Sequence, residues 1–159
     1  MSERIGMICK LAPQELKGIY TFDKIDSDDI DGLSVSMLDA FKDTVDFNGE
    51  TIEELNKEIC SIVESTFGTF IPDASFQIKQ NGEIAAVVLI SLFKGKPFVS
   101  ELFTVKKYLK QGMASNLLKK SINVLMNLGY DDLILYVHPE NAAAVNLYKK
   151  NWVYRIIIL

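Results

Sequence analysis

The chain has 159 residues, of which 48% are hydrophobic and 24% are charged, a composition typical of one soluble globular domain with a sizeable core. Its net charge of −4 disfavours a general nucleic-acid-binding protein. No apolar run approaches the roughly 20 residues of a membrane span, and the N-terminus lacks the basic and apolar regions of a signal peptide. Cys9 and Cys60 are too few for a disulfide framework and lack metal-ligand spacing. We therefore expect a single cytoplasmic domain over residues 1–159, without a membrane, nucleic-acid or metal partner.

The charge is distributed unevenly along the chain. Residues 1–60 contain 6 Lys and Arg against 14 Asp and Glu, whereas residues 61–159 contain 11 against 7. The acidic run at residues 23–32 resembles a calcium-binding loop in composition but not in spacing. The positions where that loop needs a ligand and a glycine hold Ile30 and Asp31. We expect this run to be a solvated loop.

The N-terminal part is expected to contain strands and then helices. Residues 5–11 and 16–22 are both candidate strands. Apolar residues at helical spacing predict a helix over about residues 33–42, and residues 43–49 have the composition of a loop.

A second helix is predicted directly after this loop. Thr51 and Glu54 form the Thr-x-x-Glu pattern of a capping box, in which each side chain accepts a hydrogen bond from the other residue's backbone. Apolar residues then follow at helical spacing, and Gly68 is expected to end the helix.

The middle of the chain is predicted to be an antiparallel β-meander. Asn81-Gly82 is a strong tight-turn signal between candidate strands at 75–79 and 83–93. Residues 94–97 form a second turn, which leads into a third strand at 98–105.

A strand–helix–strand unit follows the meander. The third strand is followed by a glycine turn at residues 110–115, a helix over 114–127 and a strand over 133–137. Such a turn collects free backbone N–H groups at the positive end of a helix dipole, which is a phosphate-binding geometry. Five lysines lie around it, namely Lys106, Lys107, Lys110, Lys119 and Lys120. We therefore expect a cofactor that carries phosphate.

The C-terminal part contains a second motif. A helix is predicted over residues 142–150, with Pro139 near its start, and a final strand over 152–159. The helix carries a spaced pattern of polar, small and aromatic residues that periodicity alone does not explain, namely Asn141, Ala144, Leu147, Tyr148, Asn151 and Trp152.

Together, the glycine turn and this second motif resemble the GNAT N-acetyltransferase superfamily. Gly112 and Ala114 match the end of that family's Arg/Gln-x-x-Gly-x-Gly/Ala turn, whereas Leu109 stands where Arg or Gln is usual. The later family pattern reads Asn-x-x-Ala-x-x-Leu-Tyr-x-x-x-Gly-Phe. Its first four defined positions match from Asn141 to Tyr148, whereas Asn151 and Trp152 replace Gly-Phe. The resemblance implies an α/β fold of mixed α+β type. It has a central, mostly antiparallel sheet flanked by helices, with a parallel βαβ unit at the cofactor site.

The resemblance also implies the cofactor and its contacts. Acetyl-CoA would bind where two parallel strands separate, with the pantetheine arm along the backbone of Leu102, Phe103 and Thr104. The pyrophosphate would bind the backbone N–H groups of the turn, formed by Gln111, Gly112, Met113, Ala114 and Ser115. Asn141 would contact the pantetheine or order its loop, and as the first residue of a helix it is also a candidate N-cap.

The implied chemistry is transfer of an acetyl group to an amine. Tyr148 matches the family's usual acid, which protonates the leaving thiolate, and the alternative is a tyrosine that only packs the last helix. Glu101 is our candidate base, although Ser100 or Phe98 lies nearer the register expected for that role. Asp46, Glu50, a water chain and His138 remain alternatives to Glu101.

The acceptor stays open at this stage. A small-molecule or peptide amine fits the resemblance, and the acidic N-terminal half favours a cationic amine or polyamine. A non-catalytic acyl-CoA-binding or regulatory module of the same fold is the main alternative, and a protein-interaction domain without a cofactor is a third. The apolar end at residues 156–159 needs cover from its own sheet or from a second subunit, so a homodimer is one open alternative.

Overall fold

The computed structural model describes residues 4–151 and 154–157. The strands are β1 (Ile5–Lys10), β2 (Thr69–Phe70), β3 (Phe76–Gln80), β4 (Glu83–Phe93), β5 (Lys96–Thr104), β6 (Asp132–Val137) and β7 (Tyr154–Ile157). The helices are α1 (Ile30–Phe41), α2 (Ile52–Val63), α3 (Met113–Asn127) and α4 (Ala142–Asn151), with short 3₁₀ turns at Ser27–Asp29, Pro72–Ala74 and Lys106–Tyr108. In the described part of the chain, the strands form one sheet in the order β2-β4-β5-β6-β1-β7, and β3 also pairs with β4.

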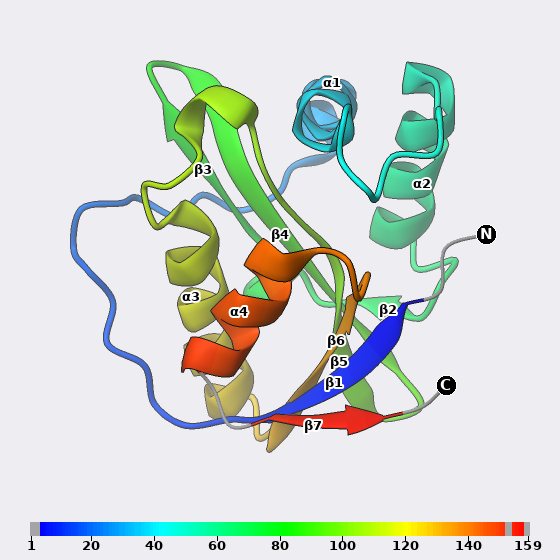
Figure 1. Cartoon of the computed structure of the whole chain (residues 1–159). Helices are drawn as coiled ribbons and strands as arrows, with labels where there is room; N and C mark the ends of the chain where they lie inside the picture. The colour runs from blue at the N-terminus through cyan, green and yellow to red at the C-terminus, as the bar shows by residue number, and fades with distance from the viewer. Residues whose placement is uncertain (1–3, 152–153, 158–159) are drawn as a thin grey trace.

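Helices cover both faces of the sheet (Figure 1), and a hydrophobic core lies on each face. The central strand β4 supplies both cores because successive side chains point to opposite faces. Val88 and Ile90 pack into the core that α3 and α4 cover, whereas Val87 and Leu89 pack into the core under α1 and α2. All four side chains are fully buried. The mixed, mostly antiparallel sheet flanked by helices confirms the predicted fold class.

Helix α2 begins where the capping box predicts it. The Thr51 side chain accepts from the backbone N–H of Glu54 at 3.2 Å, and the Glu54 carboxylate accepts from the backbone N–H of Thr51 at 3.1 Å. The helix ends at Val63, however, before the predicted stop at Gly68. Ser65, with φ of 62°, already leaves the helical conformation, and Gly68 instead allows close approach to the carbonyl oxygen of Leu92.

The predicted meander of β3, β4 and β5 is confirmed. Asn81 and Gly82 form its first turn with φ of 53° and 77°. The second turn is shorter than expected, because Lys94 and Gly95 alone take positive φ and β5 already starts at Lys96.

One predicted strand is wrong. Residues 16–22 form no strand and instead cross the outer side of α3 as an extended loop (Figure 1). Side chains of α3 accept hydrogen bonds from the backbone of this segment, as where the N–H of Lys17 donates to Asn116 Oδ1 at 3.3 Å. Directly after this segment, Asp23 forms an isolated β-bridge with Gln77 of β3.

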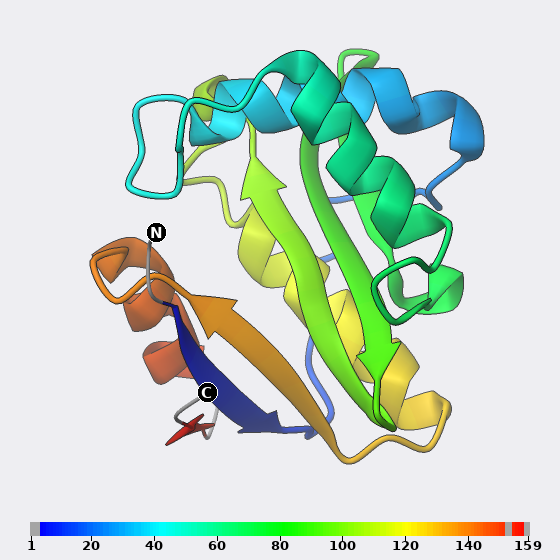
Figure 2. The same ribbon diagram turned by 90° about the vertical axis from the view of Figure 1, so that its right-hand side faces the viewer.

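The parallel βαβ unit β5–α3–β6 is confirmed, and its two strands separate quickly (Figure 2). Their parallel pairing is limited to Phe98 opposite Ile134. Strand β1 lies antiparallel between β6 and β7, so the first strand sits within the C-terminal part of the sheet. The predicted final strand is confirmed over residues 154–157, whereas residues 152–153 and 158–159 lie outside the described residues. No helix in the described ranges is long and apolar enough to cross a membrane.

Candidate active site

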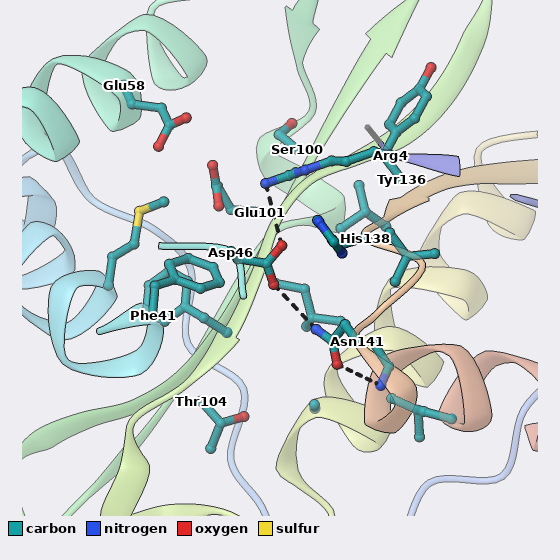
Figure 3. A pocket seen from close by; sticks show the side chains of 18 of the residues that line it. Arg4, Phe41, Asp46, Glu58, Ser100, Glu101, Thr104, Tyr136, His138 and Asn141 are labelled. Carbon is teal, nitrogen blue, oxygen red and sulfur yellow. Dashed lines mark hydrogen bonds and ion pairs between the residues drawn. The ribbon is translucent and has the colours of Figure 1, made fainter. Parts of the chain in front are cut away.

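A cavity of about 430 Å³ opens where β5 and β6 separate (Figure 3). Residues 99–104 of β5 form one wall, and residues 136–138 with the start of α4 form another. Side chains of α1, α2 and the loop between them close the remaining side. The cavity therefore collects residues from both halves of the chain.

A β-bulge in β5 determines which side chains enter this cavity. Glu101 lies opposite Leu89 and Val99 lies opposite Ile90, so Ser100 is an extra residue between two paired positions. Val99 packs towards the α3 core, and an unbroken strand would send residue 101 to the same face. Because the bulge reverses the alternation, Glu101 lines the cavity on the side of α1 and α2, next to Phe103. The bulge therefore explains how Glu101 reaches the cavity, although Ser100 or Phe98 lies nearer the register expected for a base.

Glu101 meets a second carboxyl group at the cavity wall. Glu58 on α2 and Glu101 on β5 both line the cavity, and their carboxyl groups point towards each other (Figure 3). Burial and the neighbouring Glu58 charge raise the pKa of Glu101 well above its usual range, while Arg4 opposes that rise. Glu58 is exposed at the rim, and the loss of hydration on its cavity side likewise raises its pKa.

Glu58 was not among the sequence candidates, although the sequence carries a signal for it. It stands three residues after Leu55 and four before Ile62, both buried on the inner face of α2. A charged residue at this position on an otherwise apolar helix face indicates a polar site on that face.

Tyr148 lies on the opposite wall, on α4. Its side chain is only 6% exposed, and it lines the same cavity as the two carboxyl groups. Burial, with a further contribution from the negative charge of Asp46, raises the pKa of Tyr148 to about 12. The phenol is therefore protonated at neutral pH and can donate a proton but not accept one.

Asp46 ties three segments together at the cavity mouth. Its Oδ2 accepts from Asn141 Nδ2 at 3.2 Å, and its Oδ1 lies 3.7 Å from Arg4 Nη2 (Figure 3). Asn141 also accepts from the backbone N–H of Ala144 at 3.1 Å, so its predicted role as helix N-cap is confirmed. His138 lines the cavity too, but its Nδ1 accepts from the backbone N–H of Glu140 at 3.1 Å.

The glycine turn lies at one end of the cavity, because α3 starts there and Ala114 is part of the lining. Gly112 is the residue before the helix, with φ of 77°, and among the described residues no side chain caps the helix start. Met113 is buried in the core and Gly112 has no side chain, so at these positions only the backbone is available to a ligand. Gln111 is exposed, and its carbonyl oxygen accepts from the Tyr20 hydroxyl.

The five lysines around the turn fall into three groups. Lys106 pairs with Asp43 at 3.4 Å, and Lys107 pairs with Glu83 at 2.6 Å. Lys120 lies over the Phe76 ring, whereas Lys110 and Lys119 have no ion pair within residues 4–151.

The predicted pantetheine-binding strand lies along the cavity. Leu102, Phe103 and Thr104 all line it, and β6 no longer pairs with β5 at these positions. One edge of this backbone is therefore unpaired in the described part of the sheet. Leu109 is 51% exposed and borders an adjoining cavity of about 310 Å³ that shares Thr104 and Asn141 with the first.

The acidic side chains do not form a metal centre. Among the described residues, no group of three or more His, Cys, Asp or Glu side chains is arranged to hold a metal ion. The cavity has instead a proton-donating tyrosine on one wall, a carboxyl pair on the other and a helix N-terminus at its end.

This arrangement agrees with comparisons to known proteins. The sequence pattern of the Acetyltransferase (GNAT) family matches residues 41–152. Over 111 residues the chain is 24% identical to N-alpha-acetyltransferase 30 of Schizosaccharomyces pombe, which covers 59% of this chain and 74% of that protein.

Solved structures share the fold at low sequence identity. A GCN5-related N-acetyltransferase from Sphaerobacter thermophilus superimposes with a TM-score of 0.71 at 16% identity, covering 98% of this chain and 50% of that chain. This chain thus spans half the length of that relative. An N-acetyltransferase for alanine of a ribosomal protein, from Escherichia coli, has a TM-score of 0.66 at 23% identity, covering 83% of this chain and 76% of that one.

A third structure contains the expected cofactor moiety. The PaiA N-acetyltransferase from Thermoplasma acidophilum, in complex with coenzyme A, has a TM-score of 0.66 at 17% identity and covers 82% of this chain and 87% of that chain. At these identities the structural likeness establishes the fold, and the family match over most of the chain establishes the family. The chain belongs to the GNAT acetyltransferase family.

Proposed function

We propose that the protein is an N-acetyltransferase that moves an acetyl group directly from acetyl-CoA to a primary amine. The observation that carries this proposal is the shared cavity, in which protonated Tyr148 faces the carboxyl groups of Glu101 and Glu58 across the gap between β5 and β6. A proton donor and a proton acceptor on opposite walls suit acyl transfer from a thioester to an amine.

The residues at the cavity fit coenzyme A. The unpaired edge of Leu102, Phe103 and Thr104 offers backbone groups to a pantetheine arm, as a neighbouring strand would. The N-terminus of α3, from Gln111 to Ser115, offers backbone N–H groups to the pyrophosphate. Lys110 and Lys119 are the lysines near this turn that remain available for charge pairing in the described structure.

Acetyl-CoA supplies an activated acetyl group, and the overall reaction yields an amide, a free thiol and one proton. Glu101 accepts a proton from the acceptor ammonium, whose pKa would be near 10.4 if it resembles Lys. The Tyr148 Oη donates its proton to the leaving sulfur and regains one from the nitrogen as the amide forms. Glu101 then releases its proton to water, so the protons balance.

The acceptor enters a cavity with more acids than bases. Among the described residues, the lining contains four acids and the guanidinium of Arg4; the acids are Asp46, Glu50, Glu58 and Glu101. This balance favours an acceptor that arrives as a cation, such as a small-molecule amine or the N-terminal amine of a peptide. The names of the relatives from Schizosaccharomyces pombe and Escherichia coli support including peptide amines.

Two measurements test the proposal. Acetyl-CoA at 100 times its Kd should raise the free energy of unfolding by about 2.7 kcal/mol, which a thermal shift detects. A panel of small and peptide amines should then contain an acceptor that the purified protein acetylates.

Replacing Tyr148→Phe separates an enzyme from a binding module. Without the proton donor, kcat should fall about a hundredfold or more, while CoA affinity stays within a fewfold of the native value. Acetyl-CoA binding with no acetylated amine in a broad panel would favour the non-catalytic module. No binding at millimolar acetyl-CoA would contradict both functions.

A further inference from the structure

Two carboxyl groups face each other across the acceptor side of the cavity. Glu58 is on α2 and Glu101 is on β5, and Figure 3 shows the two side chains approaching each other from these two elements. The bulge at Ser100 turns Glu101 to this face, and the capping box at Thr51 determines where α2 starts. Two separate features, one in each element, thus bring the two carboxyl groups to the same cavity.

We propose that Glu58 is a positioning residue for the reaction: it pairs with Glu101 so that the two carboxyl groups accept the acceptor's proton jointly. The inference rests on the proposed N-acetyl transfer. Glu101 takes the proton from the ammonium nitrogen, breaking an N–H bond and forming an O–H bond. The proton is then shared with Glu58 and released to water before the next turnover.

The physical basis is mutual repulsion between two carboxylates. Two like charges in contact resist ionising together, so the second proton leaves the pair at a higher pH than it would leave either group alone. A base with a pKa closer to neutral transfers protons more effectively at neutral pH. The raised pKa of Glu101 has this direction, since burial and the Glu58 charge are its two largest causes.

Charged and titratable groups from every surrounding element face the pair. Arg4 precedes β1, Asp46 and Glu50 lie between α1 and α2, His138 follows β6, and Tyr148 is on α4. Arg4 favours ionisation of Glu101, whereas Asp46 opposes it. Substitutions of Glu58 and Arg4 should therefore act in opposite directions, which a merely structural role would not produce.

The first test is the pH dependence of kcat/KM with one amine acceptor. Glu58→Gln keeps the size of the side chain and removes its charge, so the acidic limb should move to lower pH by about one unit. Glu53→Gln is the matched control, since Glu53 is an exposed acid on the same helix outside the cavity, and its profile should coincide with the native one. An unchanged limb in the Glu58→Gln protein would overturn the inference.

The Arg4→Gln variant should shift the pH profile in the direction opposite to Glu58→Gln. Loss of the positive charge should move the acidic limb to higher pH. If the acidic limb moved in the same direction in both variants, the shared-proton pair would be contradicted. A general loosening of the site would not depend on the sign of the charge that is removed.

Carboxyl carbon NMR of the free protein gives a readout that needs no turnover. The resonance of Glu101, assigned by its absence in Glu101→Gln, should titrate at a lower pH in Glu58→Gln than in the native protein. Independent titration of the two groups would overturn the pairing. If the pair is seen but no amine is acetylated, the proposed enzymatic function has failed rather than the pairing.

Discussion

At the scale of single residues, the surroundings of Tyr148 determine how strongly it holds its proton. Its phenol is surrounded by the core of α3 and α4, and the nearby Asp46 charge further disfavours ionisation. Both influences keep the proton on the oxygen at neutral pH. A protonated tyrosine can donate its proton to a leaving thiolate, and the raised pKa makes Tyr148 a weaker acid than an exposed tyrosine.

This burial predicts a specific dependence of stability on alkaline pH. The phenol titrates near pH 10.0 when unfolded and near pH 12 when folded. Above pH 10 the unfolded state therefore holds fewer protons, so stability should fall between pH 10 and 12, by roughly 2 to 3 kcal/mol in all. Urea unfolding of the native protein and of Tyr148→Phe measures the two free energies of unfolding. The native value minus the Tyr148→Phe value should fall between pH 10 and 12.

Cys9 makes the comparison with Tyr148→Phe necessary. Burial raises the pKa of its thiol from 9.0 to about 11, so Cys9 also lowers stability as pH rises through this range. Because both proteins contain Cys9, its effect cancels in the difference. Parallel stability curves for the two proteins above pH 10 would show that the Tyr148 phenol is not protected by the fold.

Gly112 is a residue whose identity is favoured by its backbone conformation. Its φ of 77° is in the left-handed region, where a side chain costs roughly 1 to 2 kcal/mol. An added Cβ would meet Asn116 Nδ2 at 3.5 Å, an ordinary contact, so the strain comes from the backbone. Gly112→Ala should lower the free energy of unfolding by about 1 kcal/mol in urea denaturation.

Gly18→Ala is the control for Gly112→Ala. At Gly18 the added Cβ meets nothing within 4 Å and φ lies outside the left-handed region, so stability should not decrease. Equal losses at the two glycines would contradict the assignment of the cost to the left-handed turn before α3.

At the scale of elements, α2 and β5 decide the acidic side of the cavity. The capping box of α2 depends on residues close together in the sequence, so it could be predicted, as could the inner face of the helix. The bulge in β5 could not, because it depends on how Leu89 and Ile90 of β4 pair with the strand. Glu101 was therefore predictable as a candidate base but not its place in the cavity, and Glu58 was not among the predicted residues.

The capping box should have a measurable contribution to stability. Thr51→Ala removes the side-chain oxygen that accepts the Glu54 N–H, so the free energy of unfolding should decrease by about 1 kcal/mol. Thr21→Ala is the control, since Thr21 is an exposed residue of the loop over α3. A loss at Thr51 no larger than that at Thr21 would show that packing, rather than the cap, holds the start of α2.

At the scale of the whole molecule, the sheet separates two cores that serve different parts of the site. The core under α3 and α4 supports Tyr148 and the glycine turn, whereas the core under α1 and α2 supports Glu58 and Glu101. Strand β4 contributes side chains to both cores. Destabilising one core should therefore lower the stability of the whole domain and not of one layer.

Ile59 tests this dependence. Its side chain is fully buried under α2, and Ile59→Ala should cost about 2 to 5 kcal/mol in a single cooperative unfolding transition. Ile52→Ala on the same helix is the control, because Ile52 is 42% exposed and should cost much less. Two separate transitions in Ile59→Ala, seen by far-UV circular dichroism and tryptophan fluorescence, would contradict the coupling of the two cores.

Several features followed from the sequence by itself, because neighbouring residues encode them. The capping box, the Asn81-Gly82 turn, the βαβ order and the Asn141–Tyr148 pattern are local, and they were sufficient for the fold class and the family. The segment at 16–22 shows the limit of such local patterns, since it forms no strand and the Lys17 N–H donates to a side chain of α3 instead.

Only the tertiary structure decided how the site is assembled. The separation of β5 from β6, the bulge at Ser100 and the meeting of Glu58 with Glu101 all depend on contacts between residues far apart in sequence. The same holds for Tyr148, since its pKa depends on burial and on a charge about a hundred residues away. Sequence patterns record which residues are present, whereas proton affinity depends on what surrounds them in space.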